Sequence, residues 1–433
     1  MNTIMKRRDL TVRSWAWSAG CLVPALAMNS VTAEAQQVFV PPVEFGDRVQ
    51  SVEQISANWV GSAALPPLLA PAEGPQTYPL QWGPVRFHPH LGYQVVYGDG
   101  VLRGTNNPQT TVLHTINPGG FFQLGKFWNF DITASLNRYS NADFNNSTAY
   151  YWALRGHVPR EKWLLDFGYQ GTMSEQTQLE TGSQIQQNTH LMSASGIYNY
   201  NTRMSVELSG SLDARLASGG VAGQSVGDYW TGSTLEWLNF QVTSRTSVGL
   251  GLGAGYNMAD PGDDWVFEQA QARLVWTPGA KFSAQASGGL QAQQFTGGAS
   301  GTEVFPLFAV LAAYRPFEQT SVSLSAKHEI GNAYQENVFT ETTTVGVGLR
   351  QRLLGRVFLD VAPSYNFRKY EATPSGSFAG REDDFVAVYA GLSTTFFKKL
   401  NASVFYQFSD NSSSDEGLSF DSTQVGLKVD YRY

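Results

Sequence analysis

The chain has 433 residues, of which only 15% are charged and 13% are aromatic, and its formal net charge at pH 7 is −7. Charges of both signs are scattered and form no basic patch, which excludes nucleic acid as an expected partner. After residue 35, no stretch approaches the roughly 18 consecutive apolar residues of a membrane-spanning helix, so a helical membrane protein is excluded as well.

The first 35 residues have the features of an export signal. A basic region that ends at Arg13 precedes a short apolar segment from Trp15 to Met28, and Ala33-Glu34-Ala35 then offers a small-x-small cleavage site. We expect residues 1–35 to be removed as a signal peptide. The only cysteine, Cys21, leaves with them, so the exported chain has no disulfide.

Residues 36–85 differ in composition from the rest of the chain. Prolines recur there, as in Pro41-Pro42 and Pro66-Pro67, and a proline removes the backbone donor that a central strand needs. We expect a proline-rich arm on the periplasmic side of a membrane. Two arrangements stay open, namely an arm that folds into the mouth of a barrel and an arm that is disordered.

Residues 86–433 show a persistent alternation of apolar and polar side chains. Clear examples run from Trp128 to Leu136, from Met204 to Leu212, from Phe282 to Ala292 and from Val357 to Phe367. A period of two places the two sets on opposite faces of a strand. Each segment is about ten residues long, which is the length of a tilted strand in a transmembrane barrel.

The connections between these segments are alternately short and long, as are the periplasmic turns and external loops of outer-membrane barrels. Nine long connections predict an all-β fold, a transmembrane antiparallel up-and-down β-barrel of about 18 strands with both termini in the periplasm. Sixteen strands is the alternative, because Gln109–Pro118 and Ser300–Tyr314 alternate weakly and Pro306 interrupts the second. The long connections are 98–108, 140–146, 175–187, 218–227, 260–264, 296–301, 331–337, 371–382 and 410–417.

The last strand, from Ser422 to Tyr433, alternates strictly and ends on two aromatic residues of one face. It resembles the C-terminal recognition strand that the barrel-assembly machinery reads in bacterial outer-membrane proteins. We therefore expect the outer membrane of a Gram-negative cell as the location, with its lipid and the barrel-assembly machinery as partners. The residues of this assembly signal are Val425, Leu427, Val429, Tyr431 and Tyr433.

Charged side chains of the strands are expected to face the lumen, because a charge on the lipid face costs about 2–4 kcal/mol at the bilayer midplane. They either line an open channel, which both signs would make weakly selective, or pair with one another and fill the interior. An 18-stranded ring leaves an aqueous channel unless something plugs it. The alternation assigns to the lumen Asp131, Asp166, Glu207, Asp213, Arg215, Glu236, Arg273, Lys327, Glu329, Arg350, Arg352, Asp360, Arg368, Lys428, Asp430 and Arg432, and the aromatic residues Tyr139, Trp230, Phe358 and Tyr370.

Several patterned positions resemble one family of bacterial barrels. The segment Phe87–Leu91 with Tyr97–Gly100 looks like the first hairpin of the beta-barrel porin type 2 family, and Ile116–Gly119 is similar to its second strand. Arg381–Asp384 and the closing strand resemble its last hairpins. The family includes proteins encoded beside exopolysaccharide export systems. The resemblance therefore implies an outer-membrane barrel with saccharide or polysaccharide export components as candidate partners, and it supplies no catalytic or ligand residues.

No catalytic, cofactor-binding or metal-binding residues are expected, and the protein is not expected to be an enzyme. No serine lies in a recognisable nucleophile context. His88 and His90 are the only closely spaced histidines, and no acidic or cysteine ligands accompany them. The sequence favours a water-filled, weakly selective channel that passes saccharide or exports exopolysaccharide. The alternative is a structural or docking barrel that is plugged by its N-terminal arm and transports nothing.

Overall fold

The computed structural model describes residues 80–432, with gaps at 101–108, 179, 181–182, 220–225, 297–300 and 398. The predicted signal peptide and nearly all of the predicted arm therefore lie outside the described residues, as does Tyr433. Within the described residues, no helix is long and apolar enough to cross a membrane.

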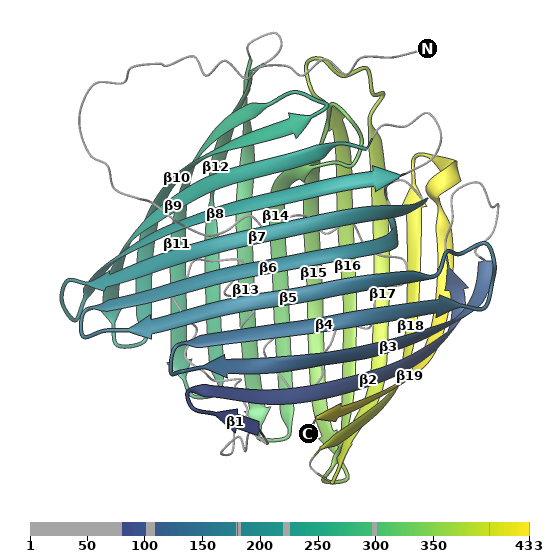
Figure 1. Cartoon of the computed structure of the whole chain (residues 1–433). Helices are drawn as coiled ribbons and strands as arrows, with labels where there is room; N and C mark the ends of the chain where they lie inside the picture. Colours follow the sequence, from purple (N-terminus) through teal and green to yellow (C-terminus); the bar gives the residue numbers. More distant parts are fainter. Residues whose placement is uncertain are drawn as a thin grey trace.

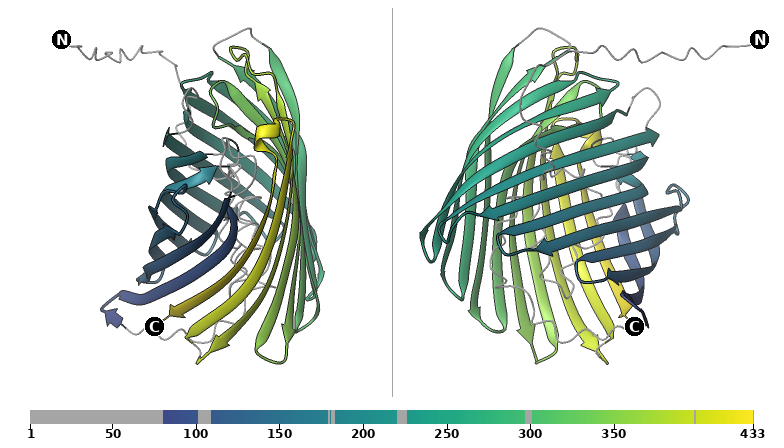
Figure 2. Two further views of the ribbon diagram at one scale, coloured as in Figure 1. Left: turned by 90° about the vertical axis from the view of Figure 1, so that its right-hand side faces the viewer. Right: turned by 60° about the vertical axis from the view of Figure 1, so that its left-hand side comes forward.

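The described chain forms one antiparallel sheet that closes on itself (Figure 1). Of its 19 strands, β1 pairs only with the start of β2, and the other 18 form the ring. Each ring strand pairs with the next one in sequence, and β19 closes the ring on β2 from Gln424↔Gly98 to Arg432↔His90. This confirms the predicted up-and-down barrel and its 18 strands. Figure 2 shows the ring from two further sides.

The elements have these bounds: β1 Leu80–Trp82, β2 Val85–Gly100, β3 Gln109–Leu124, β4 Trp128–Tyr139, β5 Ser147–Pro159, β6 Trp163–Gln178, β7 Ser183–Asn199, β8 Met204–Gly219, β9 Asp228–Thr243, β10 Thr246–Asp260, β11 Trp265–Gly279, β12 Phe282–Phe295, β13 Thr302–Phe317, β14 Thr320–Asn332, β15 Val338–Leu353, β16 Val357–Ala372, β17 Arg381–Phe396, β18 Leu400–Ser413, the 3-10 helix η1 Glu416–Leu418, and β19 Phe420–Arg432.

The two faces of the sheet have opposite polarity. The outer face exposes apolar side chains, such as Leu250 and Leu252 of β10 at 69% and 68% exposure. The inner face buries polar side chains, such as Gln285 and Gln293 of β12. This is the reverse of a water-soluble fold, and it suits a barrel with lipid outside.

Aromatic side chains gather on the outer face near the rim of short turns. Phe87 of β2 stacks on Phe122 of β3 with 4.5 Å between ring centroids, and Trp163 of β6 lies 4.6 Å from Tyr198 of β7. Aromatic residues in such a belt occupy the boundary between hydrocarbon and water. The belt therefore marks one edge of the membrane-spanning zone.

The ring strands are connected by tight turns at one rim and by longer loops at the other. In the turn between β3 and β4, Gly125 adopts a φ of 64°, a value that residues with a side chain rarely take. Most of the predicted loops are shorter than expected, as two examples show. β6 runs on to Gln178 and β7 begins at Ser183, while β18 continues to Ser413. The ends of these strands are polar on both faces, so the alternation of apolar and polar residues did not predict that the pairing continues there.

Candidate functional site

At the long-loop rim, the wall is interrupted between β13 and β14. The ladder between these strands ends at Phe308↔His328, although β13 extends to Thr302 and β14 to Asn332. Pro306 lies just beyond the last paired position and has no N–H to donate to a neighbouring strand. The upper half of the β14–β15 hairpin is thereby released from the wall on one side.

This released hairpin bends into the barrel. At the start of β15, Val338, Phe339 and Thr340 are all buried, so both faces of the strand are covered by protein. The ring of Phe339, only 1% exposed, lies 5.9 Å from that of Phe295 and 5.7 Å from that of Phe305, which belong to the inner face of β12 and β13. The outer face of the hairpin thus packs against the inner face of the wall.

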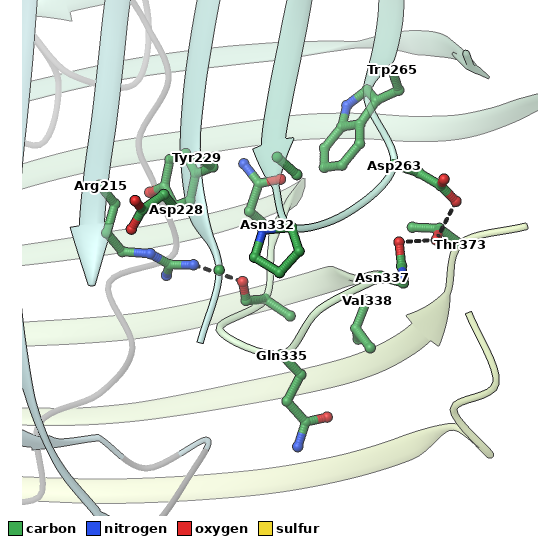
Figure 3. A pocket seen from close by; sticks show the side chains of 14 residues that line it. Arg215, Asp228, Tyr229, Asp263, Trp265, Asn332, Gln335, Asn337, Val338 and Thr373 are labelled. Atoms are coloured by element: carbon green, nitrogen blue, oxygen red, sulfur yellow. Dashed lines mark hydrogen bonds between the residues drawn. The ribbon is translucent and has the colours of Figure 1, made fainter. Parts of the chain in front are cut away.

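The tip of the same hairpin reaches the opposite wall. Arg215 of β8 donates from Nη2 to the carbonyl of Ala333 at 2.6 Å (Figure 3). Its guanidinium also lies 3.7 Å from the ring centroid of Tyr334. The Tyr334 hydroxyl donates to Gln187 of β7 at 2.6 Å. The N–H of Gly227 donates to the Tyr334 carbonyl at 3.1 Å. Tyr334 therefore anchors the hairpin tip to β7, β8 and the β8–β9 connection.

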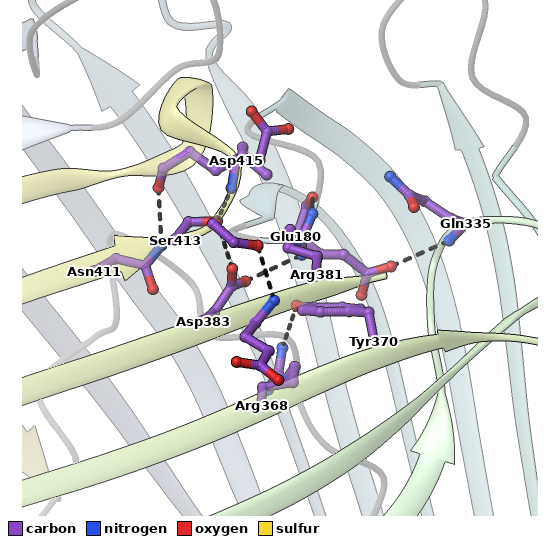
Figure 4. A network of polar contacts seen from close by, with 12 residues as sticks. Glu180, Gln335, Arg368, Tyr370, Arg381, Asp383, Asn411, Ser413 and Asp415 are labelled. Carbon is purple, nitrogen blue, oxygen red and sulfur yellow. Dashed lines mark hydrogen bonds and ion pairs between the residues drawn. The ribbon is translucent and has the colours of Figure 1, made fainter. Parts of the chain in front are cut away.

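A second hairpin, β6–β7, bends inward from that opposite wall. Its ladder with β5 ends at Tyr150↔Met173, and its tip carries Glu180, which is 2% exposed. The Glu180 carboxylate accepts hydrogen bonds from the N–H groups of Tyr334 and Gln335 (Figure 4). Six ring strands separate the two hairpins on one side and eight on the other. The two tips therefore meet over the lumen from nearly opposite positions.

Arginine side chains hold this meeting point to the wall of β16 and β17. Arg381 donates from Nη1 to the Glu180 carbonyl at 3.0 Å and pairs with Asp383 at 3.1 Å. Its guanidinium also lies 3.7 Å from the ring centroid of Tyr370, whose hydroxyl accepts from Arg368 at 3.3 Å. We call the assembly of Glu180, Tyr334 and Arg381 the hairpin latch.

A separate contact joins two loops beside the hairpin latch. Asp263, in the β10–β11 turn, accepts from the Thr373 hydroxyl at 2.7 Å and from the Ser375 N–H at 3.0 Å, both in the β16–β17 connection. Burial alone would raise the pKa of Asp263, but these hydrogen bonds to its carboxylate lower the pKa below its usual value. The carboxylate thus stays ionised and fixes the two loops together.

Below the hairpin latch, the inner wall carries charged pairs. Glu207 and Arg273 form a buried ion pair at 2.7 Å, and Arg273 also donates to Asn239 at 2.7 Å. The other inner pairs are Arg350–Asp360 at 3.7 Å, Lys428–Asp430 at 3.4 Å and Lys327–Glu329. Opposite charges close to one another create little net field along the lumen. The interior is polar and balanced in sign.

The strand registers place most of the residues assigned to the lumen. Asp166, for example, pairs directly with the buried Ser195, and directly paired residues share a face. Arg432 pairs with His90 in the ladder, but its side chain lies outside the described part of the chain. The positions on the inward register are Asp131, Asp166, Glu207, Asp213, Arg215, Arg273, Lys327, Glu329, Arg350, Arg352, Asp360, Arg368, Lys428 and Asp430.

Glu236 and Trp230 of β9 depart from the expectation. Glu236 pairs with Leu208 on one side and with the exposed Leu252 on the other, so the structure places it on the outer face. Trp230 has the same parity and is 41% exposed. Their neighbours Tyr229 and Trp237 occupy the inner positions, where each covers an arginine guanidinium. In β9 the residues that face inward are therefore the neighbours of those that the alternation predicted.

The closing strand presents its predicted face outward. Val425, Leu427 and Tyr431 are exposed on the outer face, and Val429 shares their parity. Tyr433 lies beyond the described residues. Among the described residues, no group of three or more His, Cys, Asp or Glu side chains is placed to hold a metal ion.

No protein-family model and no curated protein matches the sequence. Several solved structures share the barrel. Pseudomonas aeruginosa OpdO is 12% identical over 80% of this chain and 97% of that chain, with a TM-score of 0.43. Pseudomonas aeruginosa OccK2 (OpdF) in complex with glucuronate is 11% identical over 80% and 97%, with a TM-score of 0.42. The ferric citrate transporter FecA is 10% identical, with a TM-score of 0.40, and this chain spans 60% of its length.

Proposed function

We propose that the chain is an outer-membrane channel for small polar solutes, and that the hairpin latch narrows its outer mouth. The observation that carries the proposal is the reversed polarity of the barrel, with exposed leucines outside and buried glutamines and ion pairs inside. A ring of 18 strands encloses more space than its own side chains fill, so water occupies the remainder. Paired charges of both signs make the channel weakly ion-selective.

In this proposal, the short turns lie in the periplasm and the long loops face outward. The inner wall offers uncharged amides and indole rings, which suit hydroxyl-rich solutes, so saccharides are the solute class that we favour. Export of exopolysaccharide would be passage of a longer saccharide chain through the same lumen. The resemblance to the beta-barrel porin type 2 family supports it.

Planar bilayer recordings test the channel. The purified chain should give stepwise conductance, and Glu180→Ala should raise the unit conductance severalfold, because the two hairpin tips then lose the carboxylate that joins them. Asp143→Ala, which removes an exposed charge at the same rim, is the matched control and should conduct like the parent.

Silence of both the parent chain and Glu180→Ala would overturn the proposal. A structural barrel would then be the better description, and one observation favours it as the second candidate: Glu207 and Arg273 are almost completely buried in the interior. Such burial indicates a region of the lumen that protein atoms fill.

A further inference from the structure

A cavity lies on the inner wall beneath the inserted hairpin, between β9 and β14. It encloses about 140 Å³ and is partly open to solvent. Its lining combines the indoles of Trp237 and Trp265 with amides such as Asn257, Gln271 and Gln291. A space of this size holds about one six-membered ring.

Two deeply buried polar atoms of this lining have no hydrogen-bond partner among the described residues. They are Nε1 of Trp237, which is 1% exposed, and Oδ1 of Asn257, which is 0% exposed. A buried donor or acceptor without a partner is unfavourable, so a ligand that satisfies it gains binding energy. The two atoms lie at different levels of the cavity, because Trp237 pairs with Gly251 and Asn257 with Thr231, and a hydroxyl group can satisfy either one, since it both donates and accepts.

The charged residues at this cavity already have polar or charged partners. Lys327 forms an ion pair with Glu329 on the same strand, and Asp213 accepts from the Tyr229 hydroxyl at 3.4 Å. An uncharged head group therefore fits better than an ionic one, because an ion would have to compete with these contacts.

The cavity also borders the interrupted seam of the wall. Phe308 and His328, the last paired residues of β13 and β14, belong to its lining, as do Leu307 and Ile330 just above them. The Phe308 ring stacks on His328 on the outer face, with 5.6 Å between centroids. The cavity is therefore lined by residues of both faces at this one place, where no ladder pair joins the described residues 302–307 and 329–332.

The outer surface beside the seam is apolar. On the outer face of β13, Val304 and Phe308 are exposed and Pro306 lies between them, so the apolar belt continues alongside the unpaired stretch. Phe305, Phe339 and Ile330 pack together on the inward side of the same stretch and cover it with apolar side chains. An apolar chain passing there would stay in apolar surroundings along its whole route.

We propose that the β13–β14 seam is a lateral portal, through which a single-chain amphiphile with an uncharged, hydroxyl-rich head passes between the membrane and the cavity. The head lies against Trp237, and the tail lies in the seam. This goes beyond a channel for soluble solutes, and it does not depend on ion conductance.

Photolabelling in vesicles tests the portal. The probe is dodecyl maltoside with a diazirine next to its head group, incorporated into dioleoylphosphatidylcholine vesicles with the full exported chain. Mass spectrometry should find labels on inner-face residues of β11–β13 as well as on the lipid-facing belt. Dodecylphosphocholine with the same diazirine should label the belt equally but the inner face at least tenfold less.

A disulfide across the seam supplies the decisive comparison. In Pro306→Cys/Ile330→Cys, oxidation should abolish the inner-face labels and reduction should restore them, while the belt labels stay constant. Leu311→Cys/Ser325→Cys, at a register pair below the seam, is the matched control and should be labelled alike in both states. Inner-face labelling that persists in the crosslinked protein would overturn the portal.

The head-group assignment has its own variant. Trp237→Phe keeps a ring beside Arg273 but removes the unpartnered donor, and it should lower inner-face labelling by the maltoside severalfold. Trp230→Phe on the outer face of the same strand should change nothing. Equal inner labelling by the two probes, or an unaffected Trp237→Phe, would reject the hydroxyl-rich ligand, and absence of any inner label would reject the proposal entirely.

Discussion

The carboxylate of Glu180 accepts a hydrogen bond from the backbone N–H of Tyr334, 154 residues away and on a hairpin from the other side of the barrel. A carboxylate that accepts from backbone N–H groups in a buried setting forms a strong, charge-assisted contact. The same carboxylate also binds the next N–H, that of Gln335, at 3.1 Å. One side chain therefore joins two inserted hairpins, and its removal affects both.

A crosslink at this point should lock the mouth. In Glu180→Cys/Gln335→Cys, oxidation should reduce bilayer conductance to well below that of the reduced protein, because the two tips can no longer separate. Reducing agent should restore the original trace in the same membrane. Identical conductance in the two states, with the disulfide confirmed by mass spectrometry, would show that the tips do not limit the current.

Acid should weaken the contact between the β10–β11 turn and the β16–β17 connection. Because the pKa of Asp263 is lowered in the folded protein, its stabilising effect is fully present above the unfolded value of 3.8 and is lost as the pH falls through the lower folded pKa. Hydrogen exchange at the Ser375 N–H, relative to exchange at amides in β10, should therefore rise once the pH falls below about 4. Asp263→Asn should remove this pH dependence, and an unchanged profile in the variant would contradict the assignment.

The barrel itself was predictable from the sequence, because lipid outside and water inside impose alternation on every strand. Glu236 shows where that reasoning fails. The segment around it carries apolar residues at both parities, Leu235 and Trp237 as well as Leu238. Glu236 was assigned to the lumen because a charge on the lipid face is energetically costly. In the structure Trp237 takes the inward position instead and stacks on Arg273, with 4.2 Å between the guanidinium and the ring centroid. This contact joins β9 to β11, so the sequence of β9 alone could not predict it.

The hairpin latch could not be predicted for a related reason. Glu180 and Tyr334 lie in polar connections whose composition is that of solvated loops, and their contact depends on hairpins from distant parts of the ring. Pro306 was the one local feature of the sequence that pointed to this region. It lies just beyond the position at which β13 and β14 separate, but in the sequence it only interrupted a weakly alternating segment.

Replacing either of two glutamates on adjacent strands by leucine should change the stability of the barrel, in opposite directions. Glu236→Leu should stabilise the barrel by about 1–2 kcal/mol, because it removes a carboxylate from the lipid face. Glu207→Leu should destabilise it by about 3–5 kcal/mol, because it leaves Arg273 buried without its ion-pair partner. Guanidinium unfolding in lipid vesicles measures both. Equal destabilisation by the two variants would contradict the outward placement of Glu236.

The orientation of the barrel can be tested with epitope tags at its two rims. The first ring strand begins, and the last one ends, at the rim of short turns, where β2 pairs with β19 from His90↔Arg432 upward. Insertion of a barrel from the periplasm leaves that rim behind and carries the long loops across the membrane. A tag in the connection 414–419 between β18 and β19 should therefore bind antibody on intact cells. A tag in the turn 200–203 between β7 and β8 should bind only after the outer membrane is permeabilised. Surface binding at 200–203 together with protection at 414–419 would reverse the orientation and place the hairpin latch on the periplasmic side.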